Sequence, residues 1–221
     1  LRYKPIWAAF AATLIVGTGS SIAGGAGAYF YTYVLGDMKL MSGVSVIGLI
    51  ASLVGIVMGP YLANRFGKKK VYLTAVIIST ALNLLRLLDV TSMILIYISA
   101  LIGGVAGGWM VPVNTSIQAD NTTYVQYKTG KRAEAAIASL TSFVSKVAQG
   151  LGGAIPGYVI AAYGFVTGAS VQPESINTGI ILCALILPLI FGILGLLIFG
   201  TQYTLDQKAV IEMDAKINRN N

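Results

Sequence analysis

Six long apolar stretches constrain what this chain can fold into. They occupy residues 6–35, 44–63, 71–88, 92–117, 135–163 and 177–200. An α-helix needs about 20 mostly apolar residues to cross a hydrocarbon core about 30 Å thick, and each stretch approaches or exceeds that length. Hydrophobic residues make up 56% of the 221 and charged residues only 10%, which is typical of a membrane protein. The sequence therefore predicts an all-α membrane protein, with a bundle of six transmembrane helices over residues 1–200 and a polar tail over residues 201–221.

Lys and Arg are distributed unevenly between the two sides of such a bundle. One side receives only Lys39, and Arg86 and Lys146 lie within apolar stretches. The remaining bases all fall on the other side: Arg2, Lys4, Arg65, Lys68, Lys69, Lys70, Lys128, Lys131, Arg132, Lys208, Lys216 and Arg219. Because cytoplasmic loops carry the excess of Lys and Arg, we expect a multi-pass protein of the cell membrane with both ends of this segment in the cytoplasm. Bases confined to short loops also argue against nucleic acid as the partner that the net charge of +7 would suggest.

The sequence offers little for enzyme chemistry. It contains no histidine, no phosphate-binding or metal-binding motif, and a single cysteine, Cys183, inside an apolar run. We therefore expect no enzyme, no metal site and no cofactor. The chain begins at Leu1 and enters an apolar run that has no small-residue cleavage site, which we interpret as a cut inside a longer protein rather than a signal peptide.

One lysine stands in the middle of the fifth apolar stretch. Lys146 lies about 17 Å along a helix that starts at the last loop charge, Glu134, and so falls close to the centre of a bilayer. A charged residue there is a functional-site hypothesis by default. Helical spacing places on its face the polar and small residues Ser139, Ser142, Gln149, Gly150 and Gly153. Such a face points to water or to another helix, unless the lysine extends to the membrane surface.

Small residues repeat at intervals of four, which predicts close helix contacts. The repeats are Gly17, Ser21 and Gly25; Gly103 and Gly107; Gly104 and Gly108; Gly153 and Gly157. They are either ordinary packing surfaces or seams that slide during a conformational change.

Three stretches resemble a family of membrane transporters. The segment GPYLANRFGKKK, residues 59–70, resembles the loop signature of the major facilitator superfamily, although Asn64 replaces its Asp and a simple basic hairpin would look similar. The segment AYFYTYVLGD, residues 28–37, resembles the seventh helix of the glycoside-pentoside-hexuronide:cation symporters, the melibiose permease-like family. A third set of residues resembles the loop between helices ten and eleven of that family, and Lys146 comes after this set in the next apolar stretch. The set consists of Asp120, Tyr124, Tyr127, Lys128, Gly130, Arg132 and Glu134. Thr123 and Gln126 stand where the family often has acids.

The resemblance implies the C-terminal half of a twelve-helix transporter, with a three-plus-three arrangement of its six helices. It implies a cavity for substrate and cation that is lined by Lys146, Ser142, Thr141, Gln149, Trp109 and Tyr29. It also implies a cytoplasmic gate made of Asp120, Tyr124, Tyr127, Arg132 and Arg65. The ligands of the coupling cation, sodium or a proton, would come mostly from the missing N-terminal six-helix half.

Three side chains have two interpretations each. Arg86 forms either a local pair with Asp89 or part of a cavity. Tyr29 belongs to an aromatic belt at the membrane surface or packs against a sugar ring. Trp109 packs between helices or forms the floor of a sugar cavity.

We therefore expect secondary active transport of a sugar or glycoside, coupled to a monovalent cation. The expected partners are the sugar, the cation, the lipid bilayer and the missing half. The alternatives are a uniporter or exporter of another small solute, or a membrane receptor or subunit on the same scaffold that does not transport.

Overall fold

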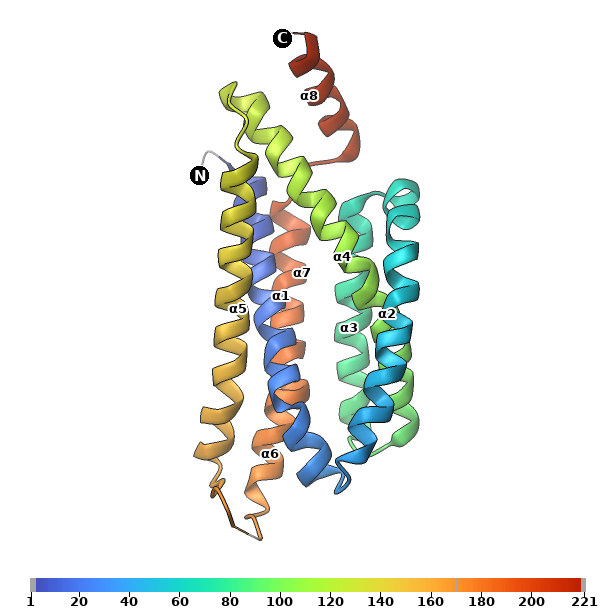
Figure 1. Ribbon diagram of the computed structural model, residues 1–221, viewed down its shortest axis with the longest axis vertical. Coiled ribbons are helices and arrows are strands. Elements are labelled where there is room, and N and C mark those ends of the chain that lie inside the picture. The colour runs from blue at the N-terminus through green and yellow to red at the C-terminus, as the bar shows by residue number, and fades with distance from the viewer. Residues whose placement is uncertain (1–2, 170, 220–221) are drawn as a thin grey trace.

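The computed structural model describes residues 3–169 and 171–219, and within them every regular element is a helix (Figure 1). In chain order they are α1 Lys4–Tyr29, the π-helical turn η1 Phe30–Val34, α2 Lys39–Phe66, α3 Lys68–Leu88, α4 Met93–Thr129, α5 Glu134–Ala162, α6 Ser175–Ile181, the π-helical turn η2 Leu182–Ile186, α7 Leu187–Gln202 and α8 Gln207–Arg219. The predicted all-α class is confirmed. Of the bases assigned to one side above, Arg2 and the side chains of Lys208 and Arg219 lie outside what is described.

Five segments of the described chain are long and apolar enough to cross a membrane: Lys4–Val34, α2, α3, α4 and Ser175–Gln202. The predicted fifth span, α5, has 29 residues and runs beside α1 along the bundle, but it is not among these five (Figure 1). Lys146, Gln149 and several glycines make it more polar than the others. The open face of α5 is therefore better suited to water or protein than to lipid.

The helix α4 is longer than predicted, because it continues to Thr129 instead of ending near Ile117. No proline or glycine follows Ile117 until Gly130, which ends the helix in the left-handed conformation at φ 69°. The predicted cytoplasmic loop is thus mostly helix, and Asp120, Tyr124 and Tyr127 lie on α4 rather than in a loop.

The helices pair in a pattern that confirms the three-plus-three arrangement. Helix α1 packs against α5 and α7, α4 packs against α2 and α3, and α3 meets α7 between the two groups. If α1 is exchanged with α4, α2 with α5 and α3 with α7, the same set of helix pairs results. The bundle therefore consists of two equivalent triplets, the first made of α1, α2 and α3 and the second of α4, α5 and α7. Because α1 and α4 run in opposite directions, the two triplets are related by inversion, and both ends of the chain lie at one end of the bundle (Figure 1).

Glycines bring two of these helix pairs into close contact. A Cβ on Gly108 or Gly104 would meet the backbone of α2, whereas one on Gly107 would have no neighbour within 4 Å. On α5, Gly152 lies against α1, and the predicted pair Gly153 and Gly157 has no neighbour within 4 Å. The close-contact prediction is thus correct for Gly104 and Gly108, and for Gly17 and Gly25 of α1, which lie against α5. It is wrong for Gly107, Gly153 and Gly157, which face open space.

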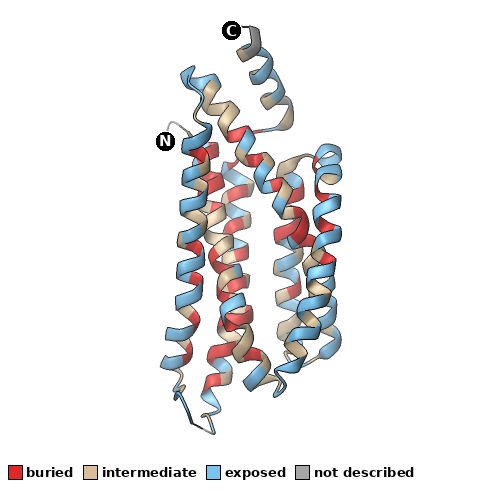
Figure 2. Cartoon of the chain, viewed as in Figure 1, coloured by how far each residue is buried: buried red, intermediate tan, exposed pale blue. Residues whose placement is uncertain are grey.

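Aromatic rings hold α3 and α7 together near the end that carries the termini. Phe199, which is 1% exposed, lies between Tyr72, with ring centroids 4.1 Å apart, and Tyr203, with centroids 4.5 Å apart. Val210 and Met213 of α8 pack against the same core, so part of the predicted polar tail folds back onto the bundle. Figure 2 shows that buried residues lie on the facing sides of the helices, while the outer sides of α2 and α5 are largely exposed.

Candidate functional site

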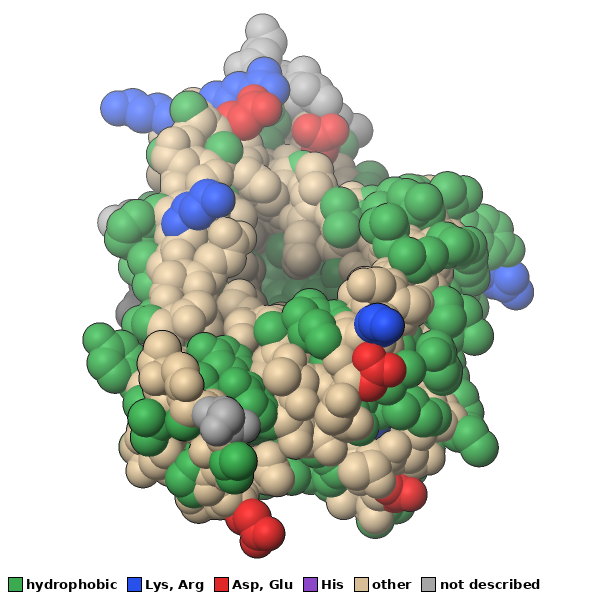
Figure 3. All heavy atoms as spheres, turned by 60° about the horizontal axis from the view of Figure 1, so that its bottom comes forward, with side chains coloured by type: hydrophobic (Ala, Val, Ile, Leu, Met, Phe, Trp, Pro, Cys, Tyr) green, Lys and Arg blue, Asp and Glu red, His purple; other side chains and the backbone are tan. Residues whose placement is uncertain are grey.

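The polar face of α5 is open. Lys146 is exposed, and its Nζ lies 3.4 Å from Gln149 Oε1, one helical turn away. The other residues predicted to share this face are also exposed: Ser139, Ser142, Gly150 and Gly153. The opposite face of α5 is buried at Ala148, Gly152 and Pro156. The predicted polar stripe is therefore confirmed, and it points away from α1. Figure 3 shows a recess between the two groups of helices, walled mostly by hydrophobic and uncharged side chains.

Thr141, which was predicted beside Ser142, lies on a different side of α5. Its hydroxyl donates to the carbonyl oxygen of Ile137 at 2.8 Å, and its side chain lines a small cavity of about 100 Å³ between α1, α4 and α5. Asn121 of α4 lines the same cavity, is 2% exposed, and its Oδ1 has no hydrogen-bond partner within the described part of the chain. Ser142 and Thr141 thus face different surroundings, because neighbouring residues on a helix point about 100° apart.

Trp109 and Tyr29 are not brought to Lys146. Trp109 is 9% exposed and belongs to a core cluster to which α1, α2, α3, α4 and α7 contribute, which supports its packing interpretation. Tyr29 stacks on Tyr33, with centroids 6.4 Å apart, and contacts the edge of Phe165, beyond the end of α5. It therefore belongs to an aromatic cluster at the end of the bundle away from the termini. Within the described residues these two side chains are therefore not grouped with Lys146, and the six-residue cavity stays a prediction.

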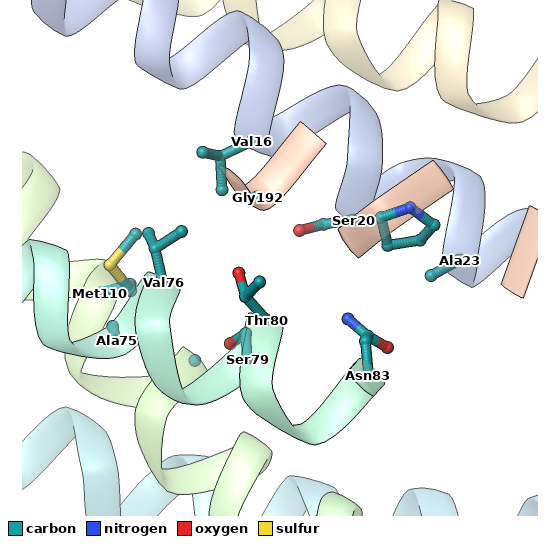
Figure 4. A pocket seen from close by; sticks show the side chains of 12 residues that line it. Val16, Ser20, Ala23, Ala75, Val76, Ser79, Thr80, Asn83, Met110 and Gly192 are labelled. Carbon is teal, nitrogen blue, oxygen red and sulfur yellow. The ribbon is translucent and has the colours of Figure 1, made fainter. Parts of the chain in front are cut away.

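A mostly apolar cavity of about 390 Å³ lies inside the bundle, between α1, α3, α4 and α7 (Figure 4). Its polar side chains come from Ser20 on α1 and from Ser79, Thr80 and Asn83 on α3. Figure 4 shows the Ser20 and Thr80 side chains facing one another across it. This cavity can hold water and hydrogen-bond a neutral polar solute, because hydroxyl and amide groups both donate and accept.

An ion pair joins α3 to α4 at the end that carries the termini. Lys68 Nζ lies 2.6 Å from Asp120 Oδ1 and 3.5 Å from the carbonyl oxygen of Ser116. Asp120 is 6% exposed, so the pair is largely out of water. Beside it, Lys69 Nζ donates to the carbonyl oxygen of Tyr203 at 2.6 Å. Burial, and the nearby charge of Asp120, raise the pKa of the Tyr203 phenol, which therefore stays neutral.

The other predicted gate residues are spread along the same end. The Lys128 ammonium lies 5.9 Å from the ring centroids of both Tyr124 and Tyr127, so these two tyrosines share one cation. Arg132 pairs with Glu134 at 3.0 Å, and both side chains are exposed. Arg65 contacts the hydroxyl of Tyr61 at 3.0 Å on the outer side of α2. Within the described residues, the five predicted gate residues therefore do not form one cluster.

The structure decides between the two interpretations of Arg86. Asp89 Oδ1 accepts hydrogen bonds from the backbone N–H and hydroxyl of Thr91, at 3.1 and 3.0 Å, and forms no ion pair with Arg86. The Arg86 guanidinium lies 5.1 Å from the centroid of the Phe30 ring and lines a second cavity. The predicted local pair is wrong, because Asp89 lies past the end of α3 and turns back to its own loop.

Some of these residues could have been found from the sequence. Ser79, Asn83 and Arg86 follow one another at intervals of four and three, which places them on one face of α3. The Lys68–Asp120 pair has no such signal, because 52 residues separate its members. In the described part of the chain, no group of three or more His, Cys, Asp and Glu residues is placed to hold a metal ion.

Residues 1–207 match the protein family described as MFS/sugar transport protein. Among curated relatives, the glucuronide carrier protein homolog of Escherichia coli K12 is 31% identical over 204 residues, which cover 88% of this chain and 44% of that protein. The putative sulfoquinovose importer of Escherichia coli K12 is 25% identical over 191 residues, or 86% of this chain and 41% of that protein. The putative 2,3-dihydroxypropane-1-sulfonate exporter of Salmonella typhimurium is 25% identical over 189 residues, again 86% and 41%. The chain thus spans less than half the length of these relatives.

Proposed function

Because the chain belongs to the MFS/sugar transport protein family, we propose that it is the C-terminal half of a secondary transporter. This transporter moves a sugar or glycoside across the cell membrane together with sodium or a proton. A second six-helix half, outside this sequence, forms the other wall of the substrate path. The end of the bundle that carries both termini faces the cytoplasm, since most of the Lys and Arg residues lie there.

The observation that carries this proposal is the exposed Lys146 in the middle of α5. A charge at that depth faces a water-filled path or an acid, and not the hydrocarbon of the bilayer. Since α5 buries its other face against α1, the lysine is directed to the surface that the second half covers. Its ammonium group has three donors for sugar hydroxyls or for a carboxylate of that half.

The same placement gives a physical basis for coupling. A carboxylate of the second half that faces Lys146 is balanced either by the lysine or by a bound cation. Binding of sodium or a proton to that carboxylate frees the ammonium group for the sugar, so that the occupancy of one site depends on the other. The inverted triplets supply a scaffold that rocks about this site and opens it alternately to each side.

The test is substrate-driven ion movement by the full-length protein in liposomes. A glucuronide and sulfoquinovose are added in turn from outside, and sodium entry and internal pH are followed. We expect one of these compounds to cause sodium or proton entry, and removal of the sodium gradient or addition of a protonophore to slow its uptake. An uptake rate that neither treatment changes would contradict symport and support facilitated diffusion.

One comparison favours a second candidate, export of a small acidic solute, since one relative is named as a putative exporter. The two candidates differ in the direction of net movement under an imposed ion gradient. Liposomes loaded with 2,3-dihydroxypropane-1-sulfonate distinguish them. Its release in exchange for an inward cation gradient supports export, whereas accumulation of an external sugar with that gradient supports import.

A further inference from the structure

A second cavity lies near the end of α3, on the side of the bundle away from the termini. It has a volume of about 240 Å³ and lies between η1, α2, α3 and α4. Its polar lining consists of Tyr31, Ser79, Asn83, Arg86 and Ser99, and its other lining residues are apolar or glycine. Ser79 and Asn83 also line the larger cavity in the middle of the bundle, so the two cavities adjoin along one face of α3.

Among the described residues that line this cavity, only Arg86 is charged, and no acid of the described chain forms an ion pair with it. The two ion pairs of the described residues, Lys68–Asp120 and Arg132–Glu134, both lie elsewhere. Arg86 Nε is buried and has no hydrogen-bond partner, and the ring of Phe30 covers one face of the guanidinium. The Arg86 side chain is half-buried, and a cation that is partly removed from water without a counter-charge is unfavourable.

The rest of the lining adds hydrogen-bond donors and no negative charge. The hydroxyls of Ser79 and Ser99 and the amide of Asn83 make no hydrogen bond to the described part of the chain, so their donors are available. No Asp or Glu lines the cavity. A positive group surrounded by groups that can donate hydrogen bonds favours an anion over a cation.

We propose that this cavity binds a small inorganic anion of the halide type, such as chloride, between Arg86 and the donors of Ser79, Asn83 and Ser99. A single positive charge balances the one negative charge of such an ion. Lys146 is not among the residues that line the cavity, so this site is distinct from the polar face of α5 on which the proposed function rests. The bound anion would tie α3 to α4, because its ligands come from both helices.

The first test measures the melting temperature Tm of the full-length transporter in sodium chloride and in sodium gluconate at equal ionic strength. Gluconate is a much larger anion than chloride and serves as the reference anion. We expect Tm to rise by about 2 °C when chloride exceeds its Kd severalfold, because a ligand that binds only the folded state stabilises it. Arg86→Gln should abolish this rise. Lys39→Gln, the same charge change on an exposed residue at the same end of the bundle, should retain it. An equal Tm in both salts, or an unchanged chloride effect in Arg86→Gln, would overturn the proposal.

A second measurement on the unmodified protein covers the case in which Arg86→Gln does not fold. Crystals of the full-length transporter are grown in sodium bromide, and the anomalous scattering of bromide is mapped. We expect a bromide peak in contact with the Arg86 guanidinium. Its absence in crystals that show bromide elsewhere would reject the site, whatever the transport activity of the protein.

Discussion

Lys68 Nζ lies 2.6 Å from Asp120 Oδ1, which links the first turn of α3 to the part of α4 that extends past its predicted end. The two residues belong to different triplets of the bundle. Asp120 is nearly buried, and the side chain of Lys68 is 22% exposed. A pair in such a setting matters chiefly through what happens when one partner is removed, since the remaining charge is left without compensation.

Asp120→Ala should destabilise the full-length transporter by about 3 kcal/mol, because Lys68 would keep only a long contact to the carbonyl oxygen of Ser116. The measurement is thermal or denaturant unfolding in detergent. Replacing both residues, as in Lys68→Met with Asp120→Leu, should recover much of the loss, since no unpaired charge remains. A double variant that loses the sum of the two single losses would contradict the ion pair.

Glu134→Gln provides the matched control for that experiment. It breaks the other ion pair of the described residues, Arg132–Glu134, whose side chains are 73% and 66% exposed. Exposed pairs contribute about 0–1 kcal/mol, so little or no change in stability is expected. If Glu134→Gln lost as much stability as Asp120→Ala, the burial of an ion pair would not determine its contribution to the stability of this protein.

Phe199→Ala should destabilise the protein by about 3–5 kcal/mol, because it removes the middle ring of a stack that is closed to water. Tyr72 and Tyr203 would then face a void between α3 and α7. Phe66→Ala, which removes a ring that is 53% exposed, is the control and should change the unfolding free energy far less. Equal effects of the two substitutions would contradict the packed stack.

The length and spacing of the apolar stretches were enough to predict the helices, whereas the three-plus-three arrangement was predicted only through the family resemblance. Pattern alone could not place the end of α4, since residues 118–129 are polar and yet contain no residue that stops a helix. It also could not tell which glycine stripe faces a neighbour. Gly103 and Gly107 repeat at the same interval as Gly104 and Gly108, and only the packing of α2 distinguishes them.

The candidate site was predictable along single helices and not between them. The polar stripe around Lys146 follows from helical spacing, and the structure has it on the open face of α5. Trp109 and Tyr29 were grouped with it through the family resemblance, but Trp109 packs in the core and Tyr29 contacts Phe165. The contact of Lys68 with Asp120 depends on how α3 crosses α4, which no local pattern records.

Lys146→Ala should reduce cation-coupled uptake by the full-length transporter at least about tenfold, a loss of roughly 1.4 kcal/mol or more in the coupled step. Expression and Tm should stay close to those of the unmodified protein, because the only hydrogen bond of the Lys146 side chain within the described residues is to Gln149, at 3.4 Å. Lys131→Ala removes an exposed charge from the connection between α4 and α5 and should leave uptake unchanged. If Lys146→Ala or Lys146→Val retains coupled uptake, the proposed role of this residue is wrong.

Gly108→Ala and Gly107→Ala test whether the contact of α4 with α2 is a static packing surface or a moving seam. A Cβ on Gly108 would lie 2.8–2.9 Å from backbone atoms of Ser52, which cannot move aside as a flexible side chain can, so we expect a loss of about 1–3 kcal/mol in stability. A Cβ on Gly107 has open space, and that variant should keep the stability of the unmodified protein.

Uptake measured well below the Tm of both variants distinguishes a static packing surface from a moving seam. A static contact predicts that Gly108→Ala, once folded, transports at the normal rate. A sliding seam predicts slower uptake with unchanged substrate binding, because the added methyl group obstructs the movement of α4 past α2 in one of the two orientations of the bundle.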